Sequence, residues 1–253
     1  MNPLYAAYAV LSYLVFLASF LYAIGFVGDL AVPKTIDAPA GAGGWAAFLV
    51  DAVVLGLFAI QHSVMARPGF KRWWTRWVPV PVERSTYVLF SSLLLCLVFV
   101  AWQPLPSPVW DLRGTPAGQV MVVLYALGWG VVLLSTFMIS HFELFGLTQA
   151  WRRARAQPAS DSVFRETFLY RFVRHPIMLG FLIAFWAAPL MTRGRLLFAV
   201  LTTGYIILGV RLEERDLLDR LGAVYAGYRA RVPMLLPMPW RRARRRTEAV
   251  TLR

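Results

Sequence analysis

Long apolar runs separated by short polar stretches organise this chain. Four runs, over residues 4–28, 45–66, 86–102 and 117–140, contain no charged residue except Asp51. A helix crosses the apolar core of a bilayer with roughly 20 residues, at about 1.5 Å per residue. The pattern therefore predicts four membrane-spanning helices, which form a bundle over residues 1–140.

Two shorter apolar runs follow, over residues 176–192 and 196–210, with only Arg193-Gly194-Arg195 between them. The second run has 15 residues and would extend about 23 Å as a helix, less than the ~30 Å of a bilayer core. We expect a short helical hairpin, and the sequence leaves open whether it crosses the bilayer fully. A loop over 141–175 precedes it, and a polar region up to 237 and a basic tail over 238–253 follow it.

The composition supports a membrane protein and excludes other classes. Hydrophobic residues make up 58% of the 253 residues and charged residues 15%, whereas soluble domains have about 25% charged residues. The aromatic content of 15% and the single cysteine exclude a disordered chain and a disulfide scaffold. We therefore predict an all-α, polytopic membrane bundle that forms a single domain.

The basic residues lie mostly on one side of the predicted spans. Of 26 Lys and Arg, 22 fall in residues 67–84, 141–175 and 211–253. Basic loops stay in the cytoplasm, so both termini are expected there. The run Arg241-Arg242-Ala243-Arg244-Arg245-Arg246 would attract anionic lipid headgroups, by about 1 kcal/mol per basic residue. The rest of the chain lacks a water-facing basic surface, so nucleic acid is not an expected partner.

The three histidines, His62, His141 and His175, all lie at predicted cytoplasmic ends of spans. Asp51 and His62 are eleven residues apart and therefore share a helix face, which should point into the bundle because ionisable groups avoid lipid. His141 and Glu143 could not share a face if their helix continued. The spacings H-x-x-x-H and H-E-x-x-H of metal sites are absent from the sequence, and no metal site is predicted.

The last third of the chain carries a recognisable set of motifs. Arg174-His175-Pro176 with Gly180, Glu213-Glu214, Tyr225 and Tyr228, and the Val-Pro and Leu-Pro pairs of residues 232–237 follow in order. This set resembles the isoprenylcysteine carboxyl methyltransferase superfamily. The stretches 61–68, 82–89 and 141–147 narrow the resemblance to its nurim-like family. Many prenylcysteine and phospholipid enzymes have Tyr where this chain has Met178, which fits a smaller, thiol substrate.

The resemblance implies methyl transfer from S-adenosylmethionine to methanethiol, a small volatile thiol, in a bacterial inner membrane. Carried over by position, the cofactor-binding residues would be Arg174, His175, Pro176, Gly180, Glu213, Glu214, Tyr225, Tyr228 and Arg229. Methyl transfer depends mainly on positioning, but the thiol must lose its proton. The candidates for that step are His141, Glu143 and His62, with Tyr87 lining the pocket.

Four alternatives remain open at this point. The chain could methylate another thiol, a lipid amine or a carboxylate, which a substrate panel would separate. It could be a non-catalytic nurim-like protein that fails to bind S-adenosylmethionine. The three histidines could hold a haem or a metal, which an absorption spectrum would reveal. A sterol-type reductase is disfavoured, since the sequence contains no nicotinamide-binding fingerprint. The sequence carries no signal for the oligomeric state.

Overall fold

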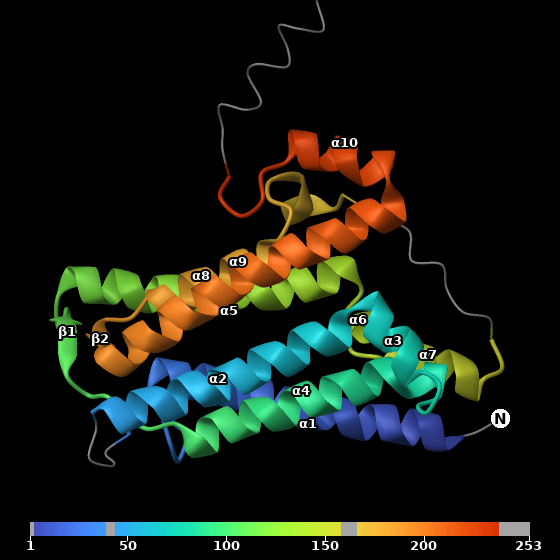
Figure 1. Ribbon diagram of the computed structural model, residues 1–253. Coiled ribbons are helices and arrows are strands. Elements are labelled where there is room, and N and C mark those ends of the chain that lie inside the picture. Colours follow the sequence, from blue (N-terminus) through green and yellow to red (C-terminus); the bar gives the residue numbers. More distant parts are fainter. Residues whose placement is uncertain (1–2, 39–43, 158–165, 238–253) are drawn as a thin grey trace, which may run out of the picture.

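The computed structural model describes residues 3–38, 44–157 and 166–237 (Figure 1). The predicted tail over 238–253 lies outside these residues. The elements are α1 (Pro3–Gly28), α2 (Trp45–Ala66), α3 (Pro68–Trp74), α4 (Val80–Ala101), β1 (Pro108–Asp111), α5 (Pro116–Ile139), α6 (His141–Leu144), α7 (Leu147–Ala154), the 3₁₀ helix η1 (Phe168–Arg171), α8 (Pro176–Trp186), β2 (Leu190–Thr192), α9 (Arg193–Leu221) and α10 (Ala223–Arg231). The predicted all-α class is confirmed.

The long helices form two groups (Figure 1). In the first, α4 packs against both α1 and α2; in the second, α8 packs against both α5 and α9. The groups meet through α2 and α9. They also share an apolar core, in which Phe26 and Trp102 of the first group belong to the same cluster as Trp129, Ala184 and Phe198 of the second.

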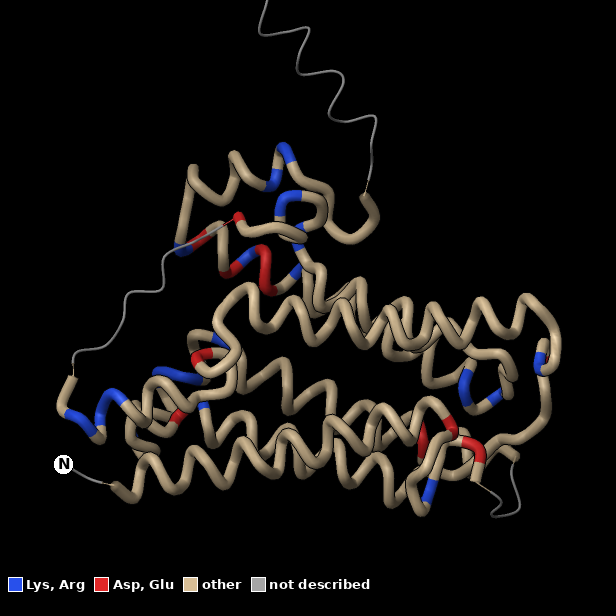
Figure 2. Tube along the Cα trace, turned by 180° about the vertical axis from the view of Figure 1, so that it is seen from behind, with Lys and Arg blue, Asp and Glu red and all other residues tan. Residues whose placement is uncertain are grey.

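Five helices of the described chain, α1, α2, α4, α5 and α9, are long and apolar enough to cross a membrane. Figure 2 shows that the charged positions gather at the two ends of the bundle, with uncharged helix between them. Large apolar side chains such as Leu14, Val123 and Leu208 are more than half exposed on its flanks. This distribution suits a lipid-facing surface, and the chain is a multi-pass membrane protein.

The last span is longer than its 15-residue apolar run, which answers the question that the sequence left open. The helix α9 has 29 residues and includes both the arginines at 193 and 195 and the charged turns up to Leu221. The Thr192 hydroxyl caps its start by accepting from the Arg195 amide at 3.1 Å, and Arg195 pairs with buried Asp37. Arg, Leu and Glu are good helix formers, so the helix continues where the apolar run ends. Only α8, with 11 residues, is short.

The connections at both ends of the second group contain structure that the sequence pattern did not predict. The strands β1 and β2 pair antiparallel and join the segment after α4 to the segment after α8. The expected loop over 141–175 contains α6, α7 and η1. Gly146, with a φ of 89°, allows the turn into α7, and its Cα lies so close to Ser85 that a Cβ would clash.

The face of α2 that carries Asp51 and His62 points into the bundle, as its eleven-residue spacing predicted. Asp51 is fully buried, and its Oδ1 accepts a hydrogen bond from the Gln103 amide at 2.7 Å. His62 bonds to Tyr87 of α4. The two ionisable residues of this span are therefore both turned away from lipid.

Gly180 of α8 lies at the closest approach of α8 to α5. A Cβ on Gly180 would sit 2.7 Å from the Gly128 carbonyl oxygen, and a Cβ on Gly128 would sit 2.6 Å from the Ala184 amide nitrogen. Small residues permit such contact between membrane helices. The position of Gly180, which we predicted to contact the cofactor, is accounted for by helix packing.

Gly180→Ala should destabilise the protein by about 1–3 kcal/mol, because the new methyl group meets backbone atoms that cannot move aside. The matched control is Gly130→Ala on α5, where a Cβ would have nothing within 4 Å. Thermal unfolding in detergent should show a lower midpoint for the first variant and an unchanged or higher midpoint for the second. Equal midpoints would show that α5 and α8 are not packed this closely.

Candidate functional site

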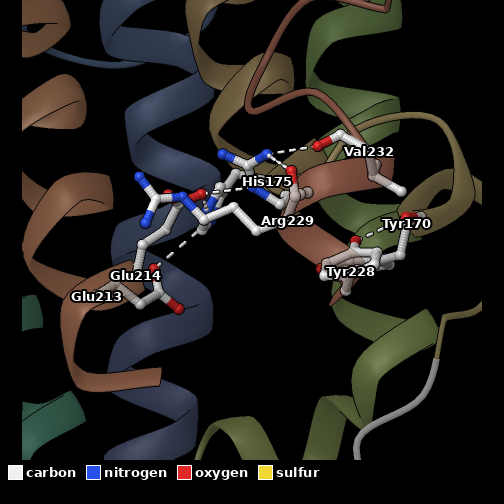
Figure 3. Close-up of polar contacts among 8 residues, drawn as sticks. Tyr170, His175, Glu213, Glu214, Tyr228, Arg229 and Val232 are labelled. Atoms are coloured by element: carbon white, nitrogen blue, oxygen red, sulfur yellow. Dashed lines mark hydrogen bonds and ion pairs between the residues drawn. The ribbon is translucent and has the colours of Figure 1, made fainter. Parts of the chain in front are cut away.

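A buried ion cluster joins α9 to the residues that precede α8 (Figure 3). Glu214 is only 4% exposed. Its Oε1 accepts from Arg174 Nε at 2.6 Å and is 3.1 Å from His175 Nε2. Arg174 and His175 are themselves buried, and Pro176 begins α8 directly after them. Buried charged and polar side chains require partners, and the Glu214 carboxylate is the common partner of Arg174 and His175.

The same cluster fastens the last described segment of the chain. The Arg174 guanidinium donates through Nη1 to the carbonyls of Arg229, at 3.1 Å, and of Val232. The backbone amides of Arg174 and His175 donate to the carbonyls of Pro233 and Met234. Residues 174–175, the end of α10 and residues 232–234 therefore form one rigid unit around Glu214.

Glu213 and Arg229 form the exposed edge of this unit. Their side chains are each half exposed. Arg229 Nε lies 3.4 Å from Glu214 Oε2, and Glu213 Oε2 lies 3.7 Å from His175 Nδ1 (Figure 3). We predicted that both glutamates meet the ligand directly. In the structure the carboxylate of Glu214 is engaged by Arg174 and His175, and the more accessible acid is Glu213.

Tyr225 and Tyr228 lie behind this edge. Both are buried and pack with Val232 and the leucines at the end of α9. The Tyr228 hydroxyl donates to the Tyr170 carbonyl at 2.6 Å, which ties α10 to η1. Burial raises the pKa of both tyrosines above the usual range, so their hydroxyls stay protonated. Their observed contacts hold α10 in place.

A second cluster of polar side chains lies between α2 and α4. The Tyr87 hydroxyl lies 2.8 Å from His62 Nε2, and the Ser91 hydroxyl lies 3.2 Å from His62 Nδ1. Because the Ser91 hydroxyl donates its single hydrogen to the Tyr87 carbonyl at 2.9 Å or to Gln61 Oε1 at 3.3 Å, it accepts from Nδ1–H. This arrangement leaves His62 Nε2 as an acceptor that faces Tyr87, as a base requires.

The His62–Tyr87 pair faces the helix that carries Glu213 and Glu214. Tyr205 of α9 makes an edge contact with the His62 ring, at 6.4 Å between centroids. Arg67, directly after α2, lies 2.8 Å from Asp216 of α9, three residues beyond Glu213. The structure thus brings a predicted proton acceptor, His62, and a predicted cofactor-binding residue, Glu213, to the boundary between α2 and α9.

His141 and Glu143, also predicted to be catalytic, lie in a different network. The helix ends at Ile139 and restarts as α6 at His141, so the two residues are not on one continuous helix. His141 Nε2 lies 2.8 Å from the Tyr13 hydroxyl and Nδ1 lies 2.8 Å from the Thr136 hydroxyl. The ring also stacks on Phe137 at 4.3 Å. These contacts assign His141 to the joint between α1, α5 and α6, and Glu143 is half-buried beside it.

The stability of this joint should depend on pH. Burial lowers the pKa of His141, so the unfolded chain binds its proton more readily than the folded protein does. Stability should therefore fall as the pH drops below about 6.5, the usual pKa of histidine. We expect the unfolding midpoint in detergent to decrease from pH 7.5 to pH 5.5, and to decrease less in His141→Gln. An equal decrease in both proteins would contradict the assignment.

The described residues contain no group of three His, Cys, Asp and Glu side chains placed to hold a metal ion. Each histidine lies in a separate network: His62 with Tyr87, His141 with Tyr13, and His175 with Glu214. A shared site for all three, which the sequence left open, is not formed by this arrangement.

Two residues of the site were missed by the sequence reasoning. Tyr205 lies eleven residues before Asp216 on α9. Residues eleven apart share a helix face, so the reasoning applied to Asp51 and His62 would also have placed Tyr205 and Asp216 on one face. Tyr170 contributes only a backbone carbonyl to Tyr228. A backbone acceptor leaves no trace in residue type, so no pattern could have indicated it.

Comparisons with known proteins place the chain in a family. A methanethiol S-methyltransferase of Mycobacterium tuberculosis is 56% identical over 92% of this chain and 96% of its own length. A methanethiol S-methyltransferase of Pseudomonas deceptionensis is 51% identical over 91% and 88%. Nurim of Rattus norvegicus is 32% identical over 69% and 73%. No family model and no solved structure matches.

The matches to the methyltransferases run across nearly the whole chain, so they include both the boundary between α2 and α9 and the Glu214 cluster. The match to nurim is weaker but still covers more than two thirds of each chain. The chain belongs to the nurim-like family, in the group that contains the methanethiol S-methyltransferases.

Proposed function

We propose that this protein transfers a methyl group from S-adenosylmethionine to methanethiol and releases dimethyl sulfide. The observation that carries the proposal is the 56% identity to a methanethiol S-methyltransferase over 92% of the chain. The Glu214 cluster and the His62–Tyr87 pair support it, because a charged cofactor and a thiol require different surroundings.

The groups around Glu214 have the chemistry that an amino-acid cofactor needs. A carboxylate would be held by the half-exposed guanidinium of Arg229, with Arg174 and His175 behind it, while an ammonium or ribose hydroxyls would meet Glu213. Charge-assisted hydrogen bonds of this kind are the strong ones. Glu214 does not meet the cofactor itself but keeps Arg174 and His175 in place. The bound cofactor supplies a methyl group on a positively charged sulfur, which an incoming sulfur can attack.

The His62–Tyr87 pair is suited to take up the thiol proton. Thiolate is the nucleophile in such a transfer, and a thiol placed beside Tyr87 can pass its proton to the tyrosine hydroxyl while the hydroxyl proton moves to His62 Nε2. A new carbon–sulfur bond forms as the bond between the methyl carbon and the cofactor sulfur breaks. Dimethyl sulfide leaves uncharged, and the proton remains on His62 until it is released to water.

The arrangement also accounts for a membrane location. We propose that the chain lies in a bacterial inner membrane with both termini in the cytoplasm, as its basic segments indicate. The charged cofactor would then reach Glu213 and Arg229 from the cytoplasm. The apolar thiol and the apolar product would exchange with the membrane.

The test is an assay of the purified full-length protein with methyl-labelled S-adenosylmethionine and methanethiol. Labelled dimethyl sulfide should accumulate in the headspace. The same assay is repeated with four other methyl acceptors, which are hydrogen sulfide, ethanethiol, phosphatidylethanolamine and a prenylcysteine. Absence of labelled dimethyl sulfide would refute the proposal. Faster labelling of one of the other acceptors would reassign the substrate.

A further inference from the structure

An ion pair joins the two groups of helices beside the proposed site. Arg67, at the end of α2, places Nη1 at 2.8 Å from Asp216 Oδ2 on α9. The two side chains are 28% and 33% exposed. Because α2 and α9 are the helices through which the groups meet, this pair bridges the boundary that the reaction must cross.

On the α2 side, the pair is built onto the turn that carries His62. Arg67 Nε donates to the Ser63 carbonyl at 3.2 Å, which fixes the direction of the guanidinium. Ser63 directly follows His62, whose ring contacts that of Tyr205 on α9. A shift of Arg67 would therefore act on the neighbouring turn, which positions His62.

On the α9 side, the pair lies on the face that carries the exposed acid of the cluster. Asp216 follows Glu213 by three residues, and residues three apart are neighbours on a helix surface. Tyr205 lies eleven residues before Asp216 and thus on the same face. The ion pair therefore holds the edge of α9 that bears Glu213 toward the His62–Tyr87 pair.

We propose that Arg67 and Asp216 are a positioning pair that sets the distance between the cofactor-binding and thiol-binding sides. The inference rests on the proposed function. A pair that is one third exposed contributes little to stability. Methyl transfer, in contrast, requires the reacting atoms in line and close together, and a displacement of about 1 Å can lower the rate 100-fold.

The kinetic test compares Arg67→Ala, Asp216→Ala and the charge-swapped double variant R67D/D216R. We expect kcat to fall about 10- to 100-fold in each single variant. Affinity for S-adenosylhomocysteine, measured by calorimetry, should stay within about twofold, because the Glu214 cluster does not include either residue. The melting temperature should change by no more than about 2–4 °C. The swapped variant should recover a large part of kcat.

The control is the ion pair between Arg113 and Asp111, at 2.6 Å, which lies beside β1 and outside the boundary of α2 and α9. Arg113→Ala should leave kcat within about twofold, since an exposed pair contributes little. Unchanged kcat in the Arg67 and Asp216 variants, an equal loss in the control, or a swapped variant as slow as the single ones would each overturn the proposal.

A second measurement does not depend on turnover. Spin labels at Val64→Cys on α2 and Arg220→Cys on α9, in a Cys96→Ser background, report the separation of the two helices. Both positions are exposed. Asp216→Ala should shift or broaden the distance distribution, and Arg113→Ala should not. An unchanged distribution in Asp216→Ala overturns the positioning role. A shifted distribution in a protein without methyltransferase activity would uphold that role and refute only the proposed function.

Discussion

Glu214→Ala should remove most of the affinity for the cofactor and destabilise the protein by about 3–5 kcal/mol. The carboxylate is buried and holds Arg174 at 2.6 Å and His175 at 3.1 Å. Without it, the buried guanidinium of Arg174 and the buried ring of His175 lose their common partner, and buried polar groups are costly to leave unpaired. Calorimetric titration with S-adenosylhomocysteine and thermal unfolding in detergent measure the two effects.

Two comparison variants separate this effect from a general change in α9. Asp219→Ala removes an exposed carboxylate from the same helix and should leave both measurements nearly unchanged. Glu214→Gln keeps the volume but not the charge, and should resemble Glu214→Ala in affinity. If Glu214→Ala bound S-adenosylhomocysteine as the unchanged protein does, the cluster would not organise the cofactor site.

His62→Ala should lower kcat about 10²- to 10⁴-fold, the usual contribution of a general base, while cofactor affinity stays the same. Tyr87→Phe should also lower kcat, because it removes the hydroxyl that lies 2.8 Å from His62 Nε2. The loss should shrink as the pH rises, since more of the thiol then ionises without a base. Initial rates of dimethyl sulfide formation between pH 6 and pH 10 measure this.

His141→Gln provides the discriminating comparison, because sequence reasoning gave both histidines the same role. The contacts of His141 are with Tyr13, Thr136 and Phe137, so this variant should lose stability rather than kcat of the folded fraction. A loss of kcat in His141→Gln as large as in His62→Ala would move the base to the joint of α1, α5 and α6.

The prediction of the bundle succeeded where the signal was an uninterrupted apolar run. The first four spans agree with α1, α2, α4 and α5, with helix α4 beginning six residues earlier than the run. It left the extent of α9 open, where charged residues follow the apolar ones. Hydropathy measures which part of a helix can lie in lipid, whereas the helix itself ends where its backbone hydrogen bonds end, at Leu221.

The candidate site was likewise predicted from the sequence only in part. Residue types in order indicated that Arg174, His175, Glu213 and Glu214 belong together, and they do. Their separate roles did not follow, because adjacent residues on a helix point about 100° apart. Glu214 consequently turns inward to Arg174, while Glu213 remains half exposed.

The sequence by itself determined the membrane class, the first four spans and the family, because these depend on composition, on periodicity and on the order of motifs along the chain. The tertiary structure alone decided which histidine lies beside Tyr87, which glutamate is engaged by Arg174, and that Arg67 meets Asp216 across 149 positions. Such contacts depend on how the helices pack, and packing arises from the shapes of side chains on several elements at once.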